Sequence, residues 1–222
     1  MNPTEPLKKD IVEFEGPSVP LATPGYLPKI YWWAYEHPLA VRFWDHGLLI
    51  NLILLGNYDR LVDAVLEEFP SPMTGSTLQI SCAYGKLTPR LQTHLGKDGT
   101  LDVIDVLNVQ LENVRRKLRR PDDRIRLIQC DATDLHCPEA LAEAFRVVKP
   151  GGQIVLVEFH NPNWWHPLKW YQRLVFLLFE PFAMDMWRHE LADYFPKGAN
   201  YSVTNMKSYF GGLYQKLVIV KK

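Results

Sequence analysis

The stretch Thr77-Leu-Gln-Ile-Ser-Cys-Ala-Tyr-Gly-Lys86 decides which fold this chain is expected to adopt. Leu78 to Ile80 predicts a strand, Ser81 to Gly85 a tight turn, and Leu87 to Leu95 a helix. Such an arrangement presents backbone N–H groups at the helix N-terminus and lets a nucleotide-like ligand approach the main chain. Only Gly85 remains in a turn that usually holds several glycines. An ordinary strand-to-helix connection is therefore the alternative interpretation.

The composition indicates a globular chain with no need of disulfide bonds. The chain has 222 residues, of which 47% are hydrophobic and 23% charged, and its formal net charge is zero. This length suits one α/β domain, and the missing basic excess argues against a nucleic-acid partner. Because Cys82, Cys130 and Cys137 form no CxxC pair, we expect a reducing compartment rather than a zinc ribbon. Met1 to Asp10 is polar, so we expect no signal peptide.

The N-terminal part predicts an arm followed by a helical cap. Residues 1–28 are rich in proline and lack apolar periodicity, which is typical of an extended arm. Residues 29–72 predict helices, and their apolar run Leu48 to Leu55 is too short to span a bilayer. This cap can pack on the domain or form an interfacial surface for lipid headgroups. We expect a single domain over residues 29–222.

An acidic residue ends the next predicted strand, Thr100 to Asp105. Asp105 lies about 20 residues beyond the glycine turn, a spacing at which an acid accepts hydrogen bonds from ribose hydroxyls. A helix N-cap or a solvated aspartate is the alternative. A helix from about Asn108 to Leu118 follows, with a basic cluster at its end. That cluster is either a solvated helix end or a group attracted to an anionic membrane.

The segment after the third predicted strand, Arg124 to Gln129, is unusually short. The next helix starts near Leu141 and leads through Pro150-Gly-Gly152 to a buried strand ending at Glu158. A further parallel strand with its connections needs a dozen or more residues, but only residues 132–140 are available. We therefore expect that about 20 to 25 residues are absent here, either by true deletion or because the chain as given omits them.

Polar residues after the buried strand are candidate catalytic or metal-binding groups. His160 follows that strand at the carboxyl edge, where open α/β sheets bind substrates, although a lone histidine is often structural. Asp185, His189 and Asp193 recur every four residues, so on a helix they share one face. Such a face can hold a divalent metal or move protons, or it can simply be solvated. Residues 160–198 are expected to form an insertion that faces substrate or membrane.

Three segments resemble class I S-adenosylmethionine (SAM)-dependent methyltransferases. The first is the opening loop, which has Gln79 in place of the family's acidic residue, with Ser81 and Ala83 at its first two glycine positions. In the second, Cys130-Asp-Ala-Thr133, the aspartate corresponds to one that contacts the adenine amino group. The third, Arg146-Val-Val-Lys-Pro-Gly-Gly-Gln-Ile-Val155, matches a hairpin of the quinone-pathway methyltransferases.

The resemblance extends to the rhodoquinone biosynthesis family, which derives from quinone methyltransferases. Two further segments carry it: Tyr31-Trp-Trp-Ala-Tyr35 and Glu180-Pro-Phe-Ala-Met-Asp-Met-Trp-Arg-His-Glu190. The resemblance implies a Rossmann-like α/β fold of the class I SAM-methyltransferase type. Its mostly parallel sheet would carry helices on both faces and a helical N-terminal cap, here without the fourth-strand segment. It also implies conversion of ubiquinone to rhodoquinone, in which an amino group from SAM replaces a ring methoxy group and Mn²⁺ assists.

The resemblance further implies the site residues and the location. A polyprenyl quinone substrate implies peripheral contact with the cytoplasmic face of the inner membrane, while the oligomeric state stays open. The catalytic residues would be Tyr84, His160, Asp185 and His189, the last three also binding the metal. The cofactor-binding residues would be Gln79, Ser81, Ala83, Tyr84, Gly85, Asp105, Val106, Asp131 and Ala132.

Two alternatives stay open. One is a conventional SAM-dependent methyltransferase acting on a quinone or phenol, for which the Pro150-Gly-Gly152 hairpin is equally good support. The other is a non-catalytic, methyltransferase-like subunit that binds quinone, because a glycine-poor loop is what such a protein would show.

Overall fold

A computed structural model describes residues 33–34, 36–82, 84–118, 120–130, 137–179, 184, 187, 195–196 and 198–222. Contacts divide the chain into two units, which are described separately. Unit 1 holds residues 1–43 and 71–131, and unit 2 holds residues 44–70 and 132–222. The helices are α1 (Pro38–Trp44), α2 (Gly47–Ile53), α3 (Tyr58–Leu66), α4 (Leu87–His94), α5 (Asn108–Lys117), α6 (Cys137–Val147) and α7 (Lys169–Phe179). The strands are β1 (Met73–Ile80), β2 (Leu95–Asp105), β3 (Ile125–Gln129), β4 (Gln153–Phe159), β5 (Tyr201–Tyr209) and β6 (Tyr214–Lys221), with a short 3-10 helix η4 (Phe210–Gly212) before β6.

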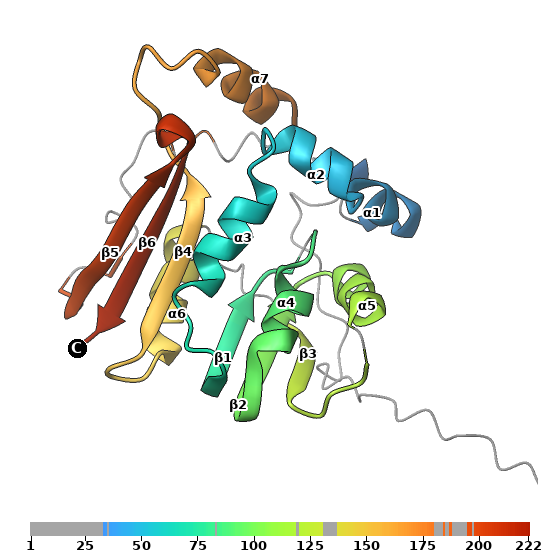
Figure 1. Cartoon of the computed structure of the whole chain (residues 1–222), viewed down its shortest axis with the longest axis vertical. Helices are drawn as coiled ribbons and strands as arrows, with labels where there is room; N and C mark the ends of the chain where they lie inside the picture. Colours follow the sequence, from blue (N-terminus) through green and yellow to red (C-terminus); the bar gives the residue numbers. More distant parts are fainter. Residues whose placement is uncertain are drawn as a thin grey trace, which may run out of the picture. The chain divides into compact units, whose positions relative to one another are not determined.

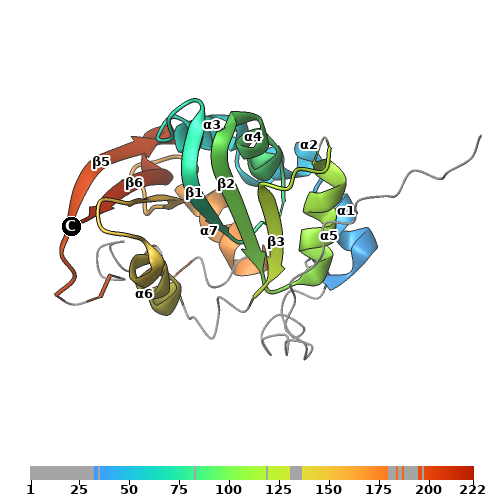
Figure 2. The ribbon, with the colours of Figure 1, turned by 90° about the horizontal axis from the view of Figure 1, so that it is seen from below.

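Unit 1 is a parallel sheet in the order β1-β2-β3 with two packed helices (Figures 1 and 2). Both α4 and α5 contact β2, and they contact each other, so they cover one face of the sheet. Leu101 and Val103 on β2 are fully buried, as expected for alternate residues beneath helices. The parallel pairing brings the carboxyl ends of β1 and β2 together, which positions the loop after β1 beside Asp105.

The start of β1 and β2 is longer than the sequence predicts. The two strands begin at Met73 and Leu95, whereas the apolar pattern indicates strands from Leu78 and Thr100. A register shift between Met73 and Gly75 allows this extension. A Cβ at Gly99 would lie 2.3 Å from the Met73 carbonyl oxygen, so only glycine permits such close approach of the two backbones.

Unit 2 is an antiparallel sheet in the order β4-β6-β5 with helices on opposite faces. Figure 1 shows α3 in front of β4 and α6 behind it. On the α6 side, Phe145 packs with Ile154 and Ile219. On the α3 side, Leu61 and Ala64 share a core with aromatic residues of β4, β5 and β6. The chain thus ends in two antiparallel strands, β5 and β6.

The part of the chain that the structure describes contains no strand between β3 and β4. Residues 137–147 form α6, and residues 131–136 lie outside the description. Among the described strands, β1 therefore pairs only with β2, and its apolar Leu78 and Ile80 remain exposed. This agrees with the expectation that a strand and its connections are absent from the chain.

Several predictions concern residues that the structure does not describe. They include the arm at residues 1–28 and most of the polar segment Glu180–Asp193. The predicted single domain, its cap at 29–72 and its insertion at 160–198 stay predictions. No helix among the described residues is both long enough and apolar enough to cross a membrane.

Candidate functional site

The loop after β1 keeps a glycine-like backbone although most of its glycines are replaced. Ser81 has φ = 65° and Gly85 has φ = 88°, both in the left-handed region that side chains other than glycine rarely adopt. A serine held there costs about 1–2 kcal/mol relative to an ordinary conformation. Such strain persists where surrounding contacts fix it, and it is frequent at ligand-binding sites.

Asp105 supplies the contacts that fix this loop. Its Oδ2 accepts a hydrogen bond from the Cys82 backbone N–H at 2.9 Å and lies 3.5 Å from the Ser81 hydroxyl. Its Oδ1 accepts a hydrogen bond from the Leu107 backbone N–H at 3.0 Å. The carboxylate is buried, and Oδ1 can accept one further donor, such as a ribose hydroxyl. The alternative of a solvated aspartate is therefore wrong.

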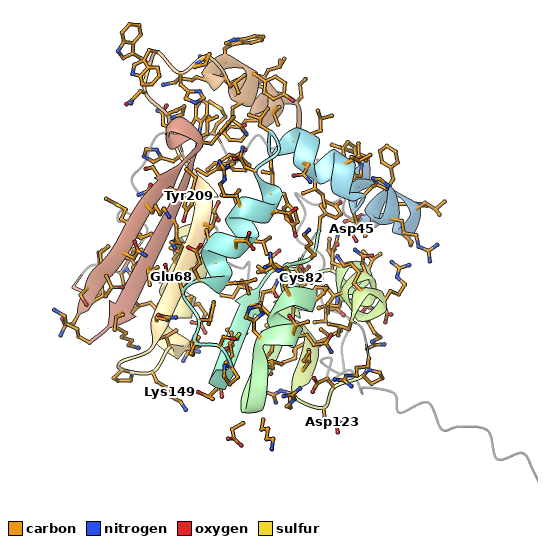
Figure 3. The ribbon with its side chains drawn as sticks, viewed as in Figure 1. Asp45, Glu68, Cys82, Asp123, Lys149 and Tyr209 are labelled. Atoms are coloured by element: carbon orange, nitrogen blue, oxygen red, sulfur yellow. The ribbon has the colours of Figure 1, made fainter. Side chains whose placement is uncertain are left out.

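The neighbouring Cys82 thiol is buried at the same turn (Figure 3). Its sulfur lies 3.4 Å from Asp105 Oδ2. Burial, and then the negative charge of Asp105, raise the pKa of Cys82 far above that of an ordinary thiol. A protonated thiol is a weak nucleophile, so Cys82 serves here as a packed, neutral side chain.

Other side chains hold the loop from outside. The Gln79 amide donates to the Ser81 carbonyl oxygen at 3.0 Å and accepts from the Thr88 hydroxyl at 2.9 Å. The Lys117 ammonium, at the end of α5, donates to the Gly85 carbonyl oxygen at 2.7 Å. Sequence reasoning assigned Lys117 to a solvated or membrane-facing helix end, and no local pattern reveals this long-range contact.

Tyr84 turns its phenol toward the N-terminal segment of the same unit. Its hydroxyl donates a hydrogen bond to the Ala34 backbone carbonyl oxygen. The contact joins the loop to a residue 50 positions earlier in the chain, which no sequence pattern predicts. The catalytic role predicted for Tyr84 stays a prediction.

The structure brings most predicted cofactor residues together in unit 1. Gln79, Ser81 and Asp105 form one hydrogen-bonded group, Gly85 accepts from Lys117, and the Val106 carbonyl oxygen accepts from Gln129 at 3.0 Å. Ala83, Asp131 and Ala132 lie outside the described residues. The described residues fit a nucleoside ligand, because a turn with two left-handed residues stands beside a buried carboxylate.

In unit 2, His160 lies directly after β4, as predicted. Its Nδ1 is 3.0 Å from the Gly212 carbonyl oxygen. Because a carbonyl oxygen only accepts hydrogen bonds, Nδ1 carries the proton and Nε2 is the basic nitrogen. His160 is therefore oriented as a general base or metal ligand would be.

Aromatic rings and unpaired polar atoms gather near the carboxyl end of β4. The Phe159 ring lies 4.7 Å from the Phe176 ring and 5.6 Å from the Tyr214 ring. Gln172 on α7 is fully buried, yet neither of its amide atoms has a hydrogen-bond partner among the described residues. The buried Tyr214 hydroxyl is likewise unpaired in that part of the chain. Burial raises the pKa of Tyr214 well above that of an ordinary phenol, so it stays a neutral donor.

These unpaired groups are functional candidates that sequence reasoning missed. A buried amide without a partner costs about 1–3 kcal/mol, and such groups call for an explanation such as a ligand or a water. Gln172 sits in the apolar run Leu168–Phe182, where the sequence gives no sign that its side chain points inward.

The predicted metal site is not placed by the structure. Asp185 and His189 lie outside the described residues, so their distance from His160 is not defined. Among the residues that are described, no three His, Cys, Asp or Glu side chains gather closely enough to hold a metal ion. The manganese assignment stays a prediction.

An open cavity of about 430 Å³ lies beside α7 in unit 2. Aromatic and basic side chains dominate its lining, which consists of Asn161, Trp164, His166, Lys169, Trp170, Arg173, Met184 and Trp187.

Comparison with solved structures defines the fold class. The chain matches an O-methyltransferase family protein from Burkholderia thailandensis with a TM-score of 0.57 and 14% identity, covering 85% of this chain and 64% of the other. It matches a geranyl diphosphate C-methyltransferase from Streptomyces coelicolor A3(2), solved with Mg²⁺, geranyl-S-thiolodiphosphate and S-adenosyl-L-homocysteine, with a TM-score of 0.54 and 13% identity. That match covers 91% of this chain and 99% of the other. A SAM-dependent methyltransferase from Aquifex aeolicus gives a TM-score of 0.52 at 16% identity, with 84% and 99% covered. The chain has the class I SAM-methyltransferase-like, Rossmann-like fold.

Sequence comparison indicates the same class. The chain is 27% identical over 138 residues to the ubiquinone/menaquinone biosynthesis C-methyltransferase UbiE of Azotobacter vinelandii (strain DJ / ATCC BAA-1303). The match covers 52% of this chain and 54% of the relative, so the chain spans about half the length of the curated protein that it matches. No family model matches the chain. The matched part of the chain is thus similar in sequence to a methyltransferase.

Proposed function

We propose that this protein is a SAM-dependent transferase that modifies the ring of a lipophilic quinone. Methyl transfer to a ring atom is the reaction that the comparisons favour, because the sequence relative is named a quinone C-methyltransferase. The observation that carries the proposal is the loop Ser81–Gly85, fixed in a glycine-like conformation around the buried Asp105 carboxylate. A pseudoenzyme has no need to retain this strained conformation and its anchor.

Each unit, taken by itself, holds groups that suit one part of this chemistry. The Asp105 carboxylate and the loop N–H groups would bind the nucleoside part of SAM, which supplies an electrophilic methyl group when bound. In unit 2, His160 Nε2 would accept the proton that a ring hydroxyl loses as the ring becomes nucleophilic. The Gln172 amide and the Tyr214 hydroxyl would donate hydrogen bonds to ring oxygens, satisfying groups that are otherwise unpaired in the described structure.

The amino transfer of rhodoquinone biosynthesis is the second candidate. The observation that favours it is Ser81, because its side chain adds volume where methyltransferases of this class have glycine. That volume would shift the methionine portion of SAM so that its amino group, rather than its methyl group, meets the quinone ring. His160, Asp185 and His189 would then hold Mn²⁺ as a Lewis acid on a quinone oxygen.

Product analysis separates the candidates. The purified protein is incubated with the quinone or its reduced form and SAM labelled with nitrogen-15 in the amino group, with and without Mn²⁺. A product heavier by one methylene, together with S-adenosylhomocysteine, supports methyl transfer. A quinone that has lost a methoxy group and gained labelled nitrogen supports amino transfer. If calorimetry detects no SAM binding and neither product forms, the proposed function is wrong.

A matched pair of histidine variants tests the assigned base. His160→Gln is expected to lower kcat by about 10²–10⁴-fold while SAM binding is unchanged. His94→Gln on α4, whose imidazole Nδ1 lies 2.8 Å from the Arg90 carbonyl oxygen, should leave kcat unchanged. Equal rates for the His160 variant and the native protein would exclude His160 as the base.

A further inference from the structure

The segment that joins β4 to α7 and forms α7 is basic and aromatic. Between Glu158 and Glu180 the sequence contains no acidic residue, but it contains Lys169 and Arg173. The whole chain has a formal net charge of zero. Positive charge is therefore concentrated locally on this segment of unit 2.

Large apolar side chains of the same segment point into solvent. Trp164 is 88% exposed, Trp165 61% and Trp170 70%. We call these three indoles, together with the exposed leucines of α7, the indole surface. The leucines are Leu174, Leu177 and Leu178. Single exposed apolar residues are ordinary, but six large exposed apolar side chains within residues 164–178 indicate an interaction surface.

Helix α7 is divided into two faces. Gln172, Val175 and Phe176 are buried and hold the helix on unit 2. Trp170, followed four residues later by Leu174 and then by Leu177 and Leu178, lies on the outward face. In Figure 1, α7 lies beyond the end of the unit 2 sheet. The exposed apolar face is therefore oriented by a rigid, packed helix rather than by a loop alone.

The cations lie among the indoles. Lys169 and Arg173 line the same cavity as Trp164 and Trp170. The Lys169 ammonium is 2.9 Å from the Pro162 carbonyl oxygen, to which it donates, and 5.9 Å from the centre of the Trp187 ring. Indoles beside basic side chains suit the boundary between acyl chains and anionic headgroups, since each group finds its preferred layer there.

We propose that unit 2 docks on an anionic phospholipid bilayer through the indole surface, with Lys169 and Arg173 facing the lipid phosphates. The charge of this segment selects a negatively charged bilayer, and the aromatic and leucine side chains enter the interfacial layer without crossing it. Docking of this kind needs neither SAM nor quinone, so it does not depend on the proposed function.

Vesicle flotation of the full chain tests this proposal. The native protein is expected to float with vesicles of phosphatidylcholine and phosphatidylglycerol, and much less with phosphatidylcholine alone. Trp164→Ser combined with Trp170→Ser should weaken binding by about tenfold or more, because two large apolar side chains no longer enter the interface. Val203→Ser combined with Met206→Ser on β5, where both residues are also exposed, is the matched control and should bind like the native protein.

Two further measurements complete the test: vesicle binding of a variant that lacks one positive charge, and the oligomeric state of the protein. Arg173→Gln should weaken binding by about fivefold, only with the anionic vesicles, and this difference should shrink at high salt. Thermal unfolding checks that each variant is folded. If the native protein floats with neither vesicle type, or if the indole variant floats as well as the native protein, the proposal is wrong. Dimerisation that the indole variant abolishes, without vesicle binding, would assign the surface to a second copy and also overturn it.

Discussion

Ser81 has a backbone conformation that is usual for glycine and rare for serine. It adopts φ = 65°, the conformation for which glycine is normally selected, and its neighbours hold it there through Asp105. Ser81 thus combines a backbone conformation typical of glycine with the larger side chain of serine. Substitution at this position separates the two effects.

We predict that Ser81→Gly raises the free energy of unfolding by about 0.5–1 kcal/mol. Relief of the left-handed strain contributes about 1–2 kcal/mol, and the greater freedom of glycine in the unfolded chain offsets part of it. Urea denaturation measures the change. The matched control is Ser76→Gly in the middle of β1, which should lower the free energy of unfolding by about 0.5–1 kcal/mol. Equal changes in the free energy of unfolding at both positions would show that the Ser81 backbone is not strained.

Substitution of Gln172 is expected to make the protein more stable and its binding of quinone weaker. Gln172→Met should raise the free energy of unfolding by about 1 kcal/mol, because a buried amide without a partner is replaced by an apolar side chain of similar size. If the amide binds the quinone ring, KM for quinone should rise about tenfold at the same time.

Gln92→Met is the control for that experiment. Gln92 is also buried, but its amide donates to the Arg120 carbonyl oxygen at 3.0 Å. Removing it should lower the free energy of unfolding by about 1 kcal/mol and leave KM for quinone unchanged. A Gln172 variant with lower stability and an unchanged KM would assign Gln172 a structural role.

At the scale of single residues, the sequence identifies groups whose position follows from local spacing. Asp105 and His160 are of this kind, since Asp105 ends a predicted strand, His160 follows one, and the structure places each at a carboxyl edge. Lys117, Thr88 and Gln172 were not identified. Their roles depend on which loop or ring a side chain meets across the fold, and no short-range pattern carries that information.

The pairing of α3 with the unit 2 sheet depends on a buried ion pair between two elements. The Lys216 side chain on β6 is 1% exposed and contacts the Glu68 carboxylate just beyond α3, while its ammonium donates to the Ala64 carbonyl oxygen at 3.1 Å. Asn205 on β5 donates to the same Glu68 side chain at 2.7 Å. Figure 3 shows Glu68 at the end of α3. The pair thus ties a helix to two strands.

We predict that Glu68→Gln lowers the free energy of unfolding by about 3 kcal/mol, since it leaves the buried Lys216 ammonium with only the largely exposed Glu67 carboxylate, 3.8 Å away, as counter-charge. Lys216→Met should cost less, because Glu68 keeps its bond to Asn205 and is 17% exposed. Glu143→Gln, which removes an exposed ion pair with Arg146, should change stability far less than Glu68→Gln, because water screens the two charges. A larger loss in the Glu143 variant than in the Glu68 variant would contradict the proposed importance of burial.

The Lys216–Glu68 ion pair predicts that the stability of the protein depends on pH under alkaline conditions. Burial acts to lower the pKa of Lys216, but Glu68 and Tyr209 together outweigh burial and the net pKa is raised. A raised folded-state pKa means that the stabilisation is fully present below the unfolded pKa of about 10.4 and is lost as pH rises through the folded value. The stability difference between the native protein and Lys216→Met should therefore be constant near neutral pH and shrink above about pH 10.5.

At the scale of elements, periodicity predicts which segments form helices and strands better than where they begin. The helix at Leu87 and the helix at Asn108 begin as predicted, because apolar spacing is a local signal. The early starts of β1 and β2 were missed, since they depend on a register shift and on close approach at Gly99. The element that the sequence predicts to be absent, a strand between β3 and β4, is also not found among the described residues.

For the whole molecule, the absence of a strand between β3 and β4 can be tested by measuring the mass of the protein. We predict that the natural protein is larger than the 25.7 kDa of this chain by about 20 to 25 residues inserted after Asp131. Intact-mass spectrometry of protein from its natural source measures this. A mass near 25.7 kDa would show that the deletion is real and that the fold tolerates the loss of a strand.

The open side of β1 has a consequence for handling the protein. Unpaired backbone N–H and C=O groups along a strand, with the exposed Leu78 and Ile80 beside them, are a template for strands of other chains. Natural sheets blunt such edges with charges, proline or a covering element. Among the described strands only β2 pairs with β1; where its other edge is uncovered, the protein should become less soluble as its concentration rises, through ordered strand addition between copies rather than through unfolding.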